Sequence, residues 1–314
     1  MQFWALLVDS FRESLDRKIF WVLVGLTLLI AFMMLSVGFE GDEVTFMFGL
    51  FSAQSEQYNP LSDVGRSSLI GIVVHLLASA IVGWFGIVLM IIATAGAFPS
   101  FMERGAIDTL LAKPISRARL FLYKYLAGML FVMLQATLFF GLTFLVMGLR
   151  WGIWAPGYLL CIPLLVLLFS YVYCVSVLVA VRTRSTLAAV LLSLGAWVAF
   201  AFIHQAPGVF DAFPSLKEHR RLCSAIRVVS WIPPKTGDFP YLAAHWAGAG
   251  TSLDIFPDSM IDTSSDEERA QVERARDIEE RELMKNPVYS IGSSLLFEAV
   301  VVLLAMWTFA RKDY

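Results

Sequence analysis

The sequence predicts an all-α integral membrane protein with six transmembrane helices, and its composition, its apolar stretches and its charge distribution all indicate this class. Of the 314 residues, 58% are hydrophobic and 16% are charged, and the mean hydropathy is +0.70. Soluble domains carry about 25% charged residues, so a chain this apolar would leave too much hydrophobic surface in water. A lipid bilayer is the solvent that fits this composition.

Six stretches are long and apolar enough to cross a bilayer. A transmembrane helix needs about 20 mostly apolar residues to span roughly 30 Å of hydrocarbon. The stretches that meet this length are Ile19–Val37, Leu69–Ala97, Leu120–Gly148, Gly157–Val181, Thr186–Ile203 and Ser290–Ala310. The second and third exceed the minimum, so we expect them to tilt or to project beyond the bilayer.

Basic residues near the ends of these spans set the expected orientation. If the N-terminus is inside, the short outer loops carry only Arg66 and Arg150. The inner segments then carry Arg12, Arg17, Lys18, Arg104, Lys113, Arg117, Arg119, Lys124, Arg182, Arg184, Arg311 and Lys312. Because cytoplasmic loops are enriched in Lys and Arg, both termini are predicted to be cytoplasmic. The chain is predicted to be a multi-pass protein of the cell membrane.

Three parts follow from the positions of the spans. Residues 1–204 form a membrane domain that contains an interfacial helix over residues 2–16 and the first five spans. Residues 205–289 form a small extracytoplasmic helical insertion, and residues 290–314 form the sixth span with a cytoplasmic tail. The interfacial helix is expected because its apolar and charged residues fall on opposite faces directly before a span.

The segments outside the membrane contain turns and short helices. Residues 38–68 form a short, acidic outer segment, and its Asn59-Pro60 and its Ser and Gly residues are interpreted as turns. In the insertion, Ser215 with Glu218 and Ser265 with Glu268 resemble capping boxes, and each predicts a helix start. Prolines break the stretch between these two helices, and they are Pro233, Pro234, Pro240 and Pro257.

The inner loop between the second and third spans, residues 98–124, contains a short amphipathic segment. A helix is predicted over Met102–Ala112, and Pro114 ends it. Three basic residues follow, which are Arg117, Arg119 and Lys124. Taken alone, these charges favour an ordinary connecting turn on the inner side. The alternative is a docking surface for a cytoplasmic partner.

The same loop resembles the inner loop of type-2 ABC transporter permeases. That family has an acidic residue and a Gly-[ST/A]-hydrophobic element before LL-x-x-P-[IVL]-[ST]-R. The matching runs are Glu103-Arg104-Gly105, Ile107-Asp108-Thr109-Leu110-Leu111 and Lys113-Pro114-Ile115-Ser116-Arg117. The N-terminal stretches Ser10-Phe11-Arg12-Glu13 and Arg17-Lys18-Ile19-Phe20-Trp21 are also similar. Within the family, the permeases grouped with multi-copper-enzyme maturation systems are most alike.

The chain departs from the family pattern in two places. Its insertion at residues 205–289 is larger than the short re-entrant helices expected there. In addition, Ala106 stands where Thr or Ser often follows the glycine.

The resemblance implies a permease subunit of an ABC transporter, driven by a separate ATP-binding cassette ATPase subunit and moving an unidentified substrate outward. The inner loop would be the coupling helix that docks on the ATPase. Its polar contacts would be Glu103, Arg104 and Asp108, while Leu110 and Leu111 would fill a pocket. A second permease copy or a paralogue would complete the pathway.

Cofactor sites and nucleic-acid binding are not expected in this chain. It contains no GxxxxGK[ST] phosphate loop, so ATP is expected to bind the partner subunit. No basic run suggests a nucleic acid. His219 and Cys223, four residues apart on a predicted helix, are weak candidates for a metal site. The alternative is that they are an ordinary half-buried His and Cys on an amphipathic helix. Because two ligands alone are a weak signal, no metal is expected.

Glu298 and His75 are ionisable residues inside predicted spans. They lie about 12 Å and 9 Å from the same side at 1.5 Å per residue. Burial of a carboxyl group at this depth is costly. We therefore expect either an intramembrane polar pair or pathway, or a protonated Glu298 that is bonded to hydroxyls or backbone.

Two other function classes remain open from the sequence. A membrane-embedded, hydrolase-like enzyme would need a nucleophile and a base at bilayer depth, and Gly292-Ser293-Ser294 with His75 is the one loose candidate. A secondary transporter would show inverted internal repeats, and no convincing repeat is found.

Overall fold

The computed structural model describes residues 18–40, 43–54, 62–103, 116–212, 233–249 and 287–312. Within these residues, six helices are long and apolar enough to cross a membrane. They are Lys18–Ser36, Gly65–Phe101, Arg117–Trp151, Pro156–Thr183, Thr186–His204 and Pro287–Arg311. Each overlaps one predicted span, so the prediction of a six-span helical membrane protein is confirmed.

Two of these spans are built from more than one element. The first, third and sixth spans are α2 (Lys18–Ser36), α7 (Arg117–Trp151) and α15 (Pro287–Arg311). The second joins α3 (Asp63–Gly71), η3 (Ile72–Gly86), α4 (Ile87–Ala95) and α5 (Ala97–Phe101). The fourth joins η4 (Pro156–Leu160) to α8 (Cys161–Thr183), and the fifth is the first part of α9 (Thr186–Ala212). Thus α9 continues beyond its predicted end at Ile203.

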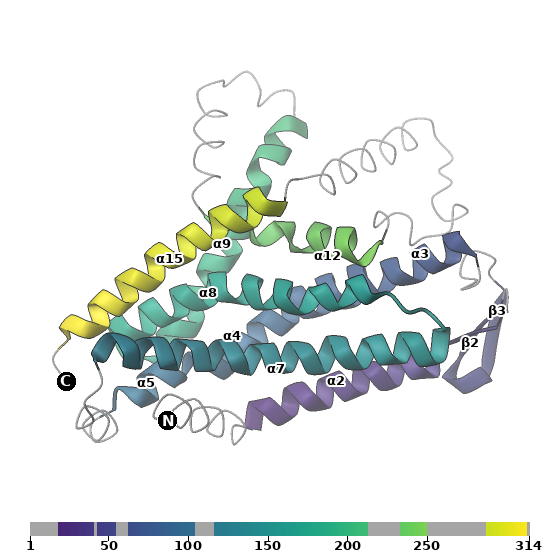
Figure 1. The fold of residues 1–314 in the computed structure, drawn as a ribbon, viewed down its shortest axis with the longest axis horizontal. Helices are drawn as coiled ribbons and strands as arrows, with labels where there is room; N and C mark the ends of the chain where they lie inside the picture. The colour runs from purple at the N-terminus through teal and green to yellow at the C-terminus, as the bar shows by residue number, and fades with distance from the viewer. Residues whose placement is uncertain are drawn as a thin grey trace.

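Helix α8 forms the centre of the bundle. In the apolar stretch of its span, 72% of the residues are buried, against 22% in each of the spans formed by α9 and α15. It packs against α7, α9, α15 and α4. Figure 1 shows α2, α7 and α8 running along the long axis, with α15 and α9 inclined across them. The outer helices therefore leave most of their apolar side chains facing away from the protein.

An aromatic stack joins α7 to α8. The rings of Tyr125 and Tyr173 are stacked with centroids 5.1 Å apart, and Tyr173 stacks on Phe169 at 4.9 Å. Gly128 lies directly against the Tyr173 ring, and a Cβ at this position would meet its Cζ at 2.7 Å. Small residues let membrane helices approach closely, where lipid supplies no hydrophobic force between them. Gly128 thus sets the spacing of the two helices.

The middle of the second span is wound as a π-helix. Residues Ile72–Gly86 form this stretch, and α-helix continues on both sides. The Ser79 hydroxyl donates to the Val74 carbonyl five residues earlier, at 3.0 Å. Such a side-chain bond fits a helix in which carbonyls are offset by five residues.

A small antiparallel sheet stands where turns were predicted for residues 38–68. Its strands β1 (Gly38–Glu40), β2 (Glu43–Phe46) and β3 (Phe51–Gln54) pair in the order β1-β2-β3. The strands were not predicted, because short runs of β-branched and aromatic residues are a weak signal, and Asn59-Pro60, where a turn was predicted, lies outside the described residues. Phe39 packs edge-on against Trp151 at the end of α7, with ring centroids 5.3 Å apart.

The described part of the insertion contains a helix that the prolines were expected to prevent. After η5 (Thr236–Asp238), helix α12 (Phe239–Ala247) begins with Pro240 in its first turn, where a proline loses no helical hydrogen bond. It packs against η3, η4 and α8. The predicted helices at residues 2–16, after Ser215 and after Ser265 lie outside the described residues.

The contact between Gly128 and Tyr173 gives a direct test of the packing. We expect Gly128→Ala to destabilise the protein by about 1–3 kcal/mol, because the buried Tyr173 ring is held by its stacking partners and cannot move aside. The measurement is thermal unfolding in detergent. Gly141→Ala on the same helix is the control, since a Cβ there meets nothing within 4 Å. Equal unfolding temperatures for the two variants would contradict this account of the packing.

Candidate functional site

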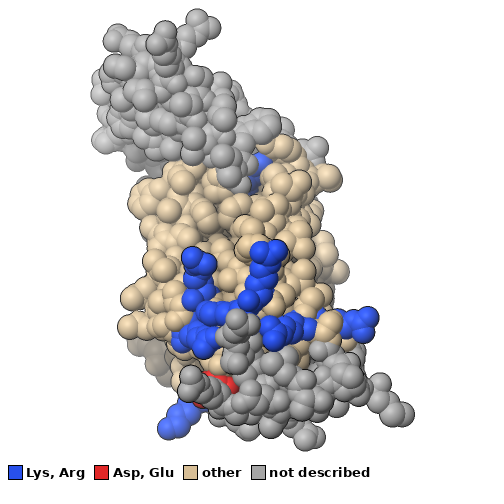
Figure 2. Space-filling model, turned by 90° about the vertical axis from the view of Figure 1, so that its left-hand side faces the viewer, with Lys and Arg blue, Asp and Glu red and all other residues tan. Residues whose placement is uncertain are grey.

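One end of the bundle is strongly basic. Helix α5, the start of α7, the turn between α8 and α9 and the end of α15 lie at the left in Figure 1. Figure 2 looks onto this end and shows Lys and Arg side chains gathered across it. Among the described residues, those at this end are Arg117, Arg119, Lys124, Arg182, Arg184, Arg311 and Lys312. Lys18 begins α2, which there packs beside Phe131 and Gln135 in the middle of α7. The others, towards the sheet end, are Arg66, Arg150 and Lys235.

Two of these basic residues join three spans. Lys312 Nζ donates to the carbonyls of Val181 and Arg182 at the end of α8, at 2.7 and 3.1 Å. Arg117 Nη1 at the start of α7 donates to the carbonyls of Ala310 and Lys312, at 3.2 and 3.0 Å. Cations are favoured at helix C-termini because the last carbonyls lack partners within the helix. The ends of α7, α8 and α15 are therefore held together.

The positive charges at this end are close enough to affect one another. Partial burial lowers the pKa of the Lys312 ammonium from its ordinary value, and the nearby charges of Arg184 and Arg182 lower this pKa further. An anionic or carbonyl-rich surface would therefore be attracted to this end.

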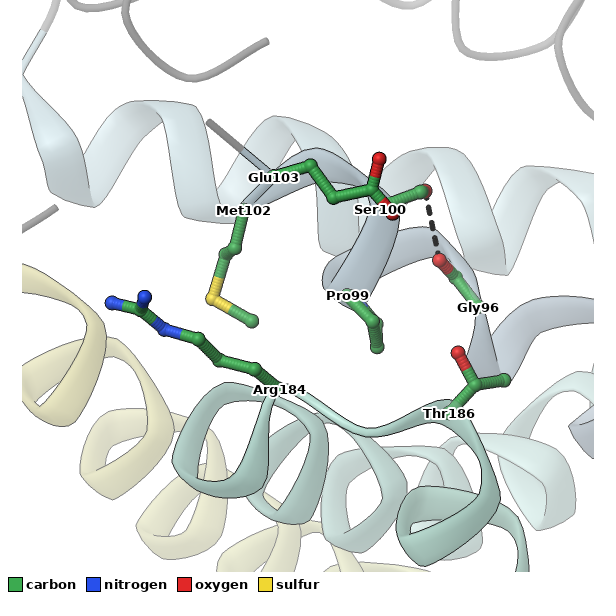
Figure 3. A pocket seen from close by; sticks show the side chains of 7 residues that line it. All are labelled: Gly96, Pro99, Ser100, Met102, Glu103, Arg184 and Thr186. Atoms are coloured by element: carbon green, nitrogen blue, oxygen red, sulfur yellow. Dashed lines mark hydrogen bonds between the residues drawn. The ribbon is translucent and has the colours of Figure 1, made fainter. Parts of the chain in front are cut away.

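A hollow of about 550 Å³ opens between α5 and the turn that joins α8 to α9. Figure 3 shows its two walls, with Arg184 and Thr186 on one side and α5 on the other. On the α5 side, Ser100 Oγ donates to the Gly96 carbonyl at 2.8 Å. The lining residues are Gly96, Pro99, Ser100, Met102, Glu103, Arg184 and Thr186.

Of the predicted docking residues, the structure describes Glu103. Its side chain is exposed and borders the hollow, directly after α5. Arg104, Asp108, Leu110 and Leu111 lie outside the described residues. The segment that contains them follows α5 and returns at Ser116, whose hydroxyl accepts from Arg119 N at 3.4 Å and begins α7. Both flanks of the predicted coupling helix therefore lie at the basic end.

A second polar site lies inside the bundle, around Glu298 of α15. One of its carboxylate oxygens accepts a hydrogen bond from the Tyr125 hydroxyl of α7, and the other accepts one from the Ser170 hydroxyl of α8, both at 2.7 Å. Glu298 lies eleven residues after Pro287, which is about 17 Å along the helix. This carboxyl group thus joins three spans near the middle of the sixth.

The predicted pairing of Glu298 with His75 stays a prediction. Both oxygens of Glu298 bond to hydroxyls, whereas His75 lies on η3 in the second span. The contacts of Glu298 match the expectation of a carboxyl group bonded to hydroxyls. The hydroxyls of Ser293 and Ser294 both donate to the Ser290 carbonyl, whereas the hydrolase-like alternative requires a serine hydroxyl that donates to His75.

Polar groups extend from Glu298 towards the sheet end of α15. Ser290 and Ser294 precede Glu298 at intervals of four residues and share its helix face. Ser290 Oγ donates to Asp238 Oδ2 at 2.5 Å, and the other oxygen of Asp238 lies 2.8 Å from His204 Nε2. Ser294 Oγ accepts from the backbone N–H of Lys235 at 2.9 Å.

The sequence did not single out this arrangement, although the spacing of Ser290, Ser294 and Glu298 was a signal for it. Asp238 is only 3% exposed, and its partners come from α9 and α15, so its role depends on contacts between distant segments. No group of three or more His, Cys, Asp or Glu that could hold a metal occurs among the residues that the structure describes. His219 and Cys223 lie outside them, so their assignment as weak metal candidates stays untested.

The two hydrogen bonds of Glu298 can be tested by substitution. Glu298→Leu leaves the Tyr125 and Ser170 hydroxyls without their acceptor, and we expect a loss of about 0.6–2 kcal/mol per bond. Glu298→Gln can accept one bond and donate in the other, so it should unfold close to the unsubstituted protein. Thermal unfolding in nanodiscs measures both.

Thr137→Val serves as the control for this series, because the exposed Thr137 hydroxyl bonds within its own helix, to the Met133 carbonyl at 2.8 Å. If Glu298→Gln is as destabilising as Glu298→Leu, the hydrogen bonds are not what Glu298 contributes.

Comparison with known proteins identifies the family. A search of curated proteins gives no match. The family described as ABC-2 family transporter protein matches residues 4–314, which is nearly the whole chain. The resemblance to type-2 ABC permeases is therefore confirmed, while the narrower likeness to the multi-copper-enzyme maturation group stays a prediction. With its six membrane-spanning helices, the chain belongs to the ABC-2 transporter family and is a multi-pass permease subunit of an ABC transporter in the cell membrane.

Proposed function

We propose that this permease couples ATP hydrolysis on a separate ATPase subunit to outward movement of a substrate, and that the ATPase docks at the basic end. The observation that carries the proposal is the position of the predicted coupling segment. It begins beside Glu103 at the end of α5 and finishes at Ser116 before α7, so a subunit bound to it would lie against the basic end.

The packing around α5 supports transmission of force from this segment. The rings of Phe98 and Phe121 lie 5.2 Å apart and join α5 to α7. Phe101 stacks on Phe309 of α15 at 6.0 Å, and Lys124 Nζ lies 5.6 Å from the Phe101 ring centre. A displacement of α5 would therefore act on α7 and α15 together, because tightly packed side chains transmit strain.

The chemistry of this end supports a protein partner with both polar and apolar contacts. Glu103 is exposed at the rim of the hollow, where a basic or amide group of the ATPase would meet it. Arg104 and Asp108 would add polar contacts, and Leu110 and Leu111 would fill an apolar pocket. ATP is bound by the partner subunit in this scheme, and this chain contributes no cofactor site.

A second permease copy or paralogue is part of the proposal. The interior around α8 is filled by side chains from its neighbours, with Phe169, Val172, Tyr173 and Cys174 all fully buried. A substrate pathway therefore fits better between two permease chains than through one. Spans α9 and α15, which bury few of their residues, offer apolar surface to lipid or to such a partner. The outward direction rests on the family resemblance.

Co-purification in mild detergent tests the docking. The tagged permease is expected to retain a stoichiometric chain with a phosphate-binding loop, identified by mass spectrometry. Combined replacement of Glu103, Leu110 and Leu111 by Ala should reduce the bound ATPase at least tenfold, because one polar and two apolar contacts are removed.

The control variant carries Glu43→Ala, Leu149→Ala and Leu160→Ala, which remove an exposed acid and two exposed leucines at the sheet end. It should retain the ATPase fully. A stable permease that binds no ATP-binding chain, or equal loss from both variants, would refute docking at the basic end.

A further inference from the structure

The connection between β2 and β3 forms an exposed apolar tip. This tip, residues Phe46–Phe51, contains the turn η1 (Met47–Gly49). Its large side chains are mostly exposed, with Met47 at 56%, Phe48 at 61% and Leu50 at 73%. Isolated apolar residues are common on protein surfaces, but several on one short hairpin make a continuous patch that normally has a partner.

The hairpin is polar at one end and apolar at the other. Glu43 pairs with Gln54 where the two strands start and finish, and Phe46 pairs with Phe51 beside the turn. Between them, the pairs Val44–Ala53 and Thr45–Ser52 alternate in polarity, so only the two ends of the hairpin differ: one is polar and the other, with the turn, is apolar. A boundary between water and hydrocarbon is an environment that fits such a separation.

The backbone of the tip is held in an unusual conformation. Met47 and Phe48 have φ angles of 49° and 59°, in the left-handed region that side-chain-bearing residues seldom adopt, and Gly49 follows at 93°. Two adjacent large apolar residues in this region are a strained arrangement. The two residues held in this conformation are also among the large exposed apolar residues of the tip.

A contact with the first span fixes the position of the tip along the axis of α2. The rings of Phe48 and Phe32 lie 5.8 Å apart, and η1 packs against α2. Phe32 is 58% exposed on the side of α2 that faces away from the bundle, and it lies four residues before the helix end at Ser36. The contact is therefore about 6 Å inside the end of the span, at 1.5 Å per residue.

We propose that the tip at Phe46–Phe51 inserts into the lipid leaflet at the sheet end of the bundle and anchors the end of α2 there. The occupant of this patch is lipid, because Phe48 continues the apolar surface that α2 already presents to the bilayer. In the expected orientation this is the outer leaflet. The opposite end of the hairpin, where Glu43 lies, remains in water.

Spin labelling of the full-length protein in liposomes tests the proposal. Labels are attached at Phe48→Cys and Leu50→Cys, in a background with Cys161, Cys174 and Cys223 replaced by Ala and shown to unfold as the original does. Glu43→Cys, at the polar end of the same hairpin, is the matched control. Collision with oxygen, which concentrates in lipid, is compared with collision with a water-soluble nickel chelate.

The labels at positions 48 and 50 are expected to collide several-fold more with oxygen than with nickel, and the label at position 43 should show the reverse preference. Nickel access at position 48 or 50 equal to that at position 43 would place the tip in water. Low access to both reagents, with spin–spin broadening, would place a second copy of the chain on the patch. Either result overturns the proposal.

Discussion

Polar contacts inside an apolar bundle hold α15 in place, and the arrangement of the other spans depends on them. In a lipid bilayer the hydrophobic effect does not favour packing of α15 against the other helices, and few residues of α15 are buried. Polar contacts at three points along α15 hold it against the other spans instead. They join Ser290 to Asp238, Glu298 to Tyr125 and Ser170, and the Ala310 carbonyl to Arg117. An unpaired polar group inside the bundle is costly, so the contacts of Ser290 and Glu298 also fix the rotation of the helix.

The same contacts connect the sixth span to the end of the molecule where the ATPase is proposed to dock. Arg117 lies just after the predicted coupling segment and bonds to the end of α15, while Lys312 bonds to the end of α8. A movement of that segment would be transmitted through α7 to α8 and α15. At the opposite end, the sheet and its apolar tip would hold the end of α2 at a fixed depth. If both proposals hold, one end of the bundle would move with the ATPase and the other would be anchored in lipid.

The sequence predicted the spans well because their signal is local. The first span was expected at Ile19–Val37 and is found at Lys18–Ser36, since the length of an apolar run is enough to place it. The position of Glu298 inside the sixth span could also be predicted, but its partners could not, because Tyr125 and Ser170 are more than 120 residues away along the chain. The role of Asp238 could not be predicted for the same reason. The sheet could not be predicted because its strands are only three or four residues long.

The central claim is that a separate ATPase contacts the segment between Glu103 and Ser116. Site-specific photo-crosslinking in native membranes tests it most directly, with a benzophenone amino acid at Leu110 and, as the comparison site, at the exposed Leu149 near the sheet end. The account predicts that a chain with a phosphate-binding loop is crosslinked from position 110 and not from position 149. Crosslinking of that chain from position 149 alone, or of a chain without such a loop from position 110, would contradict it.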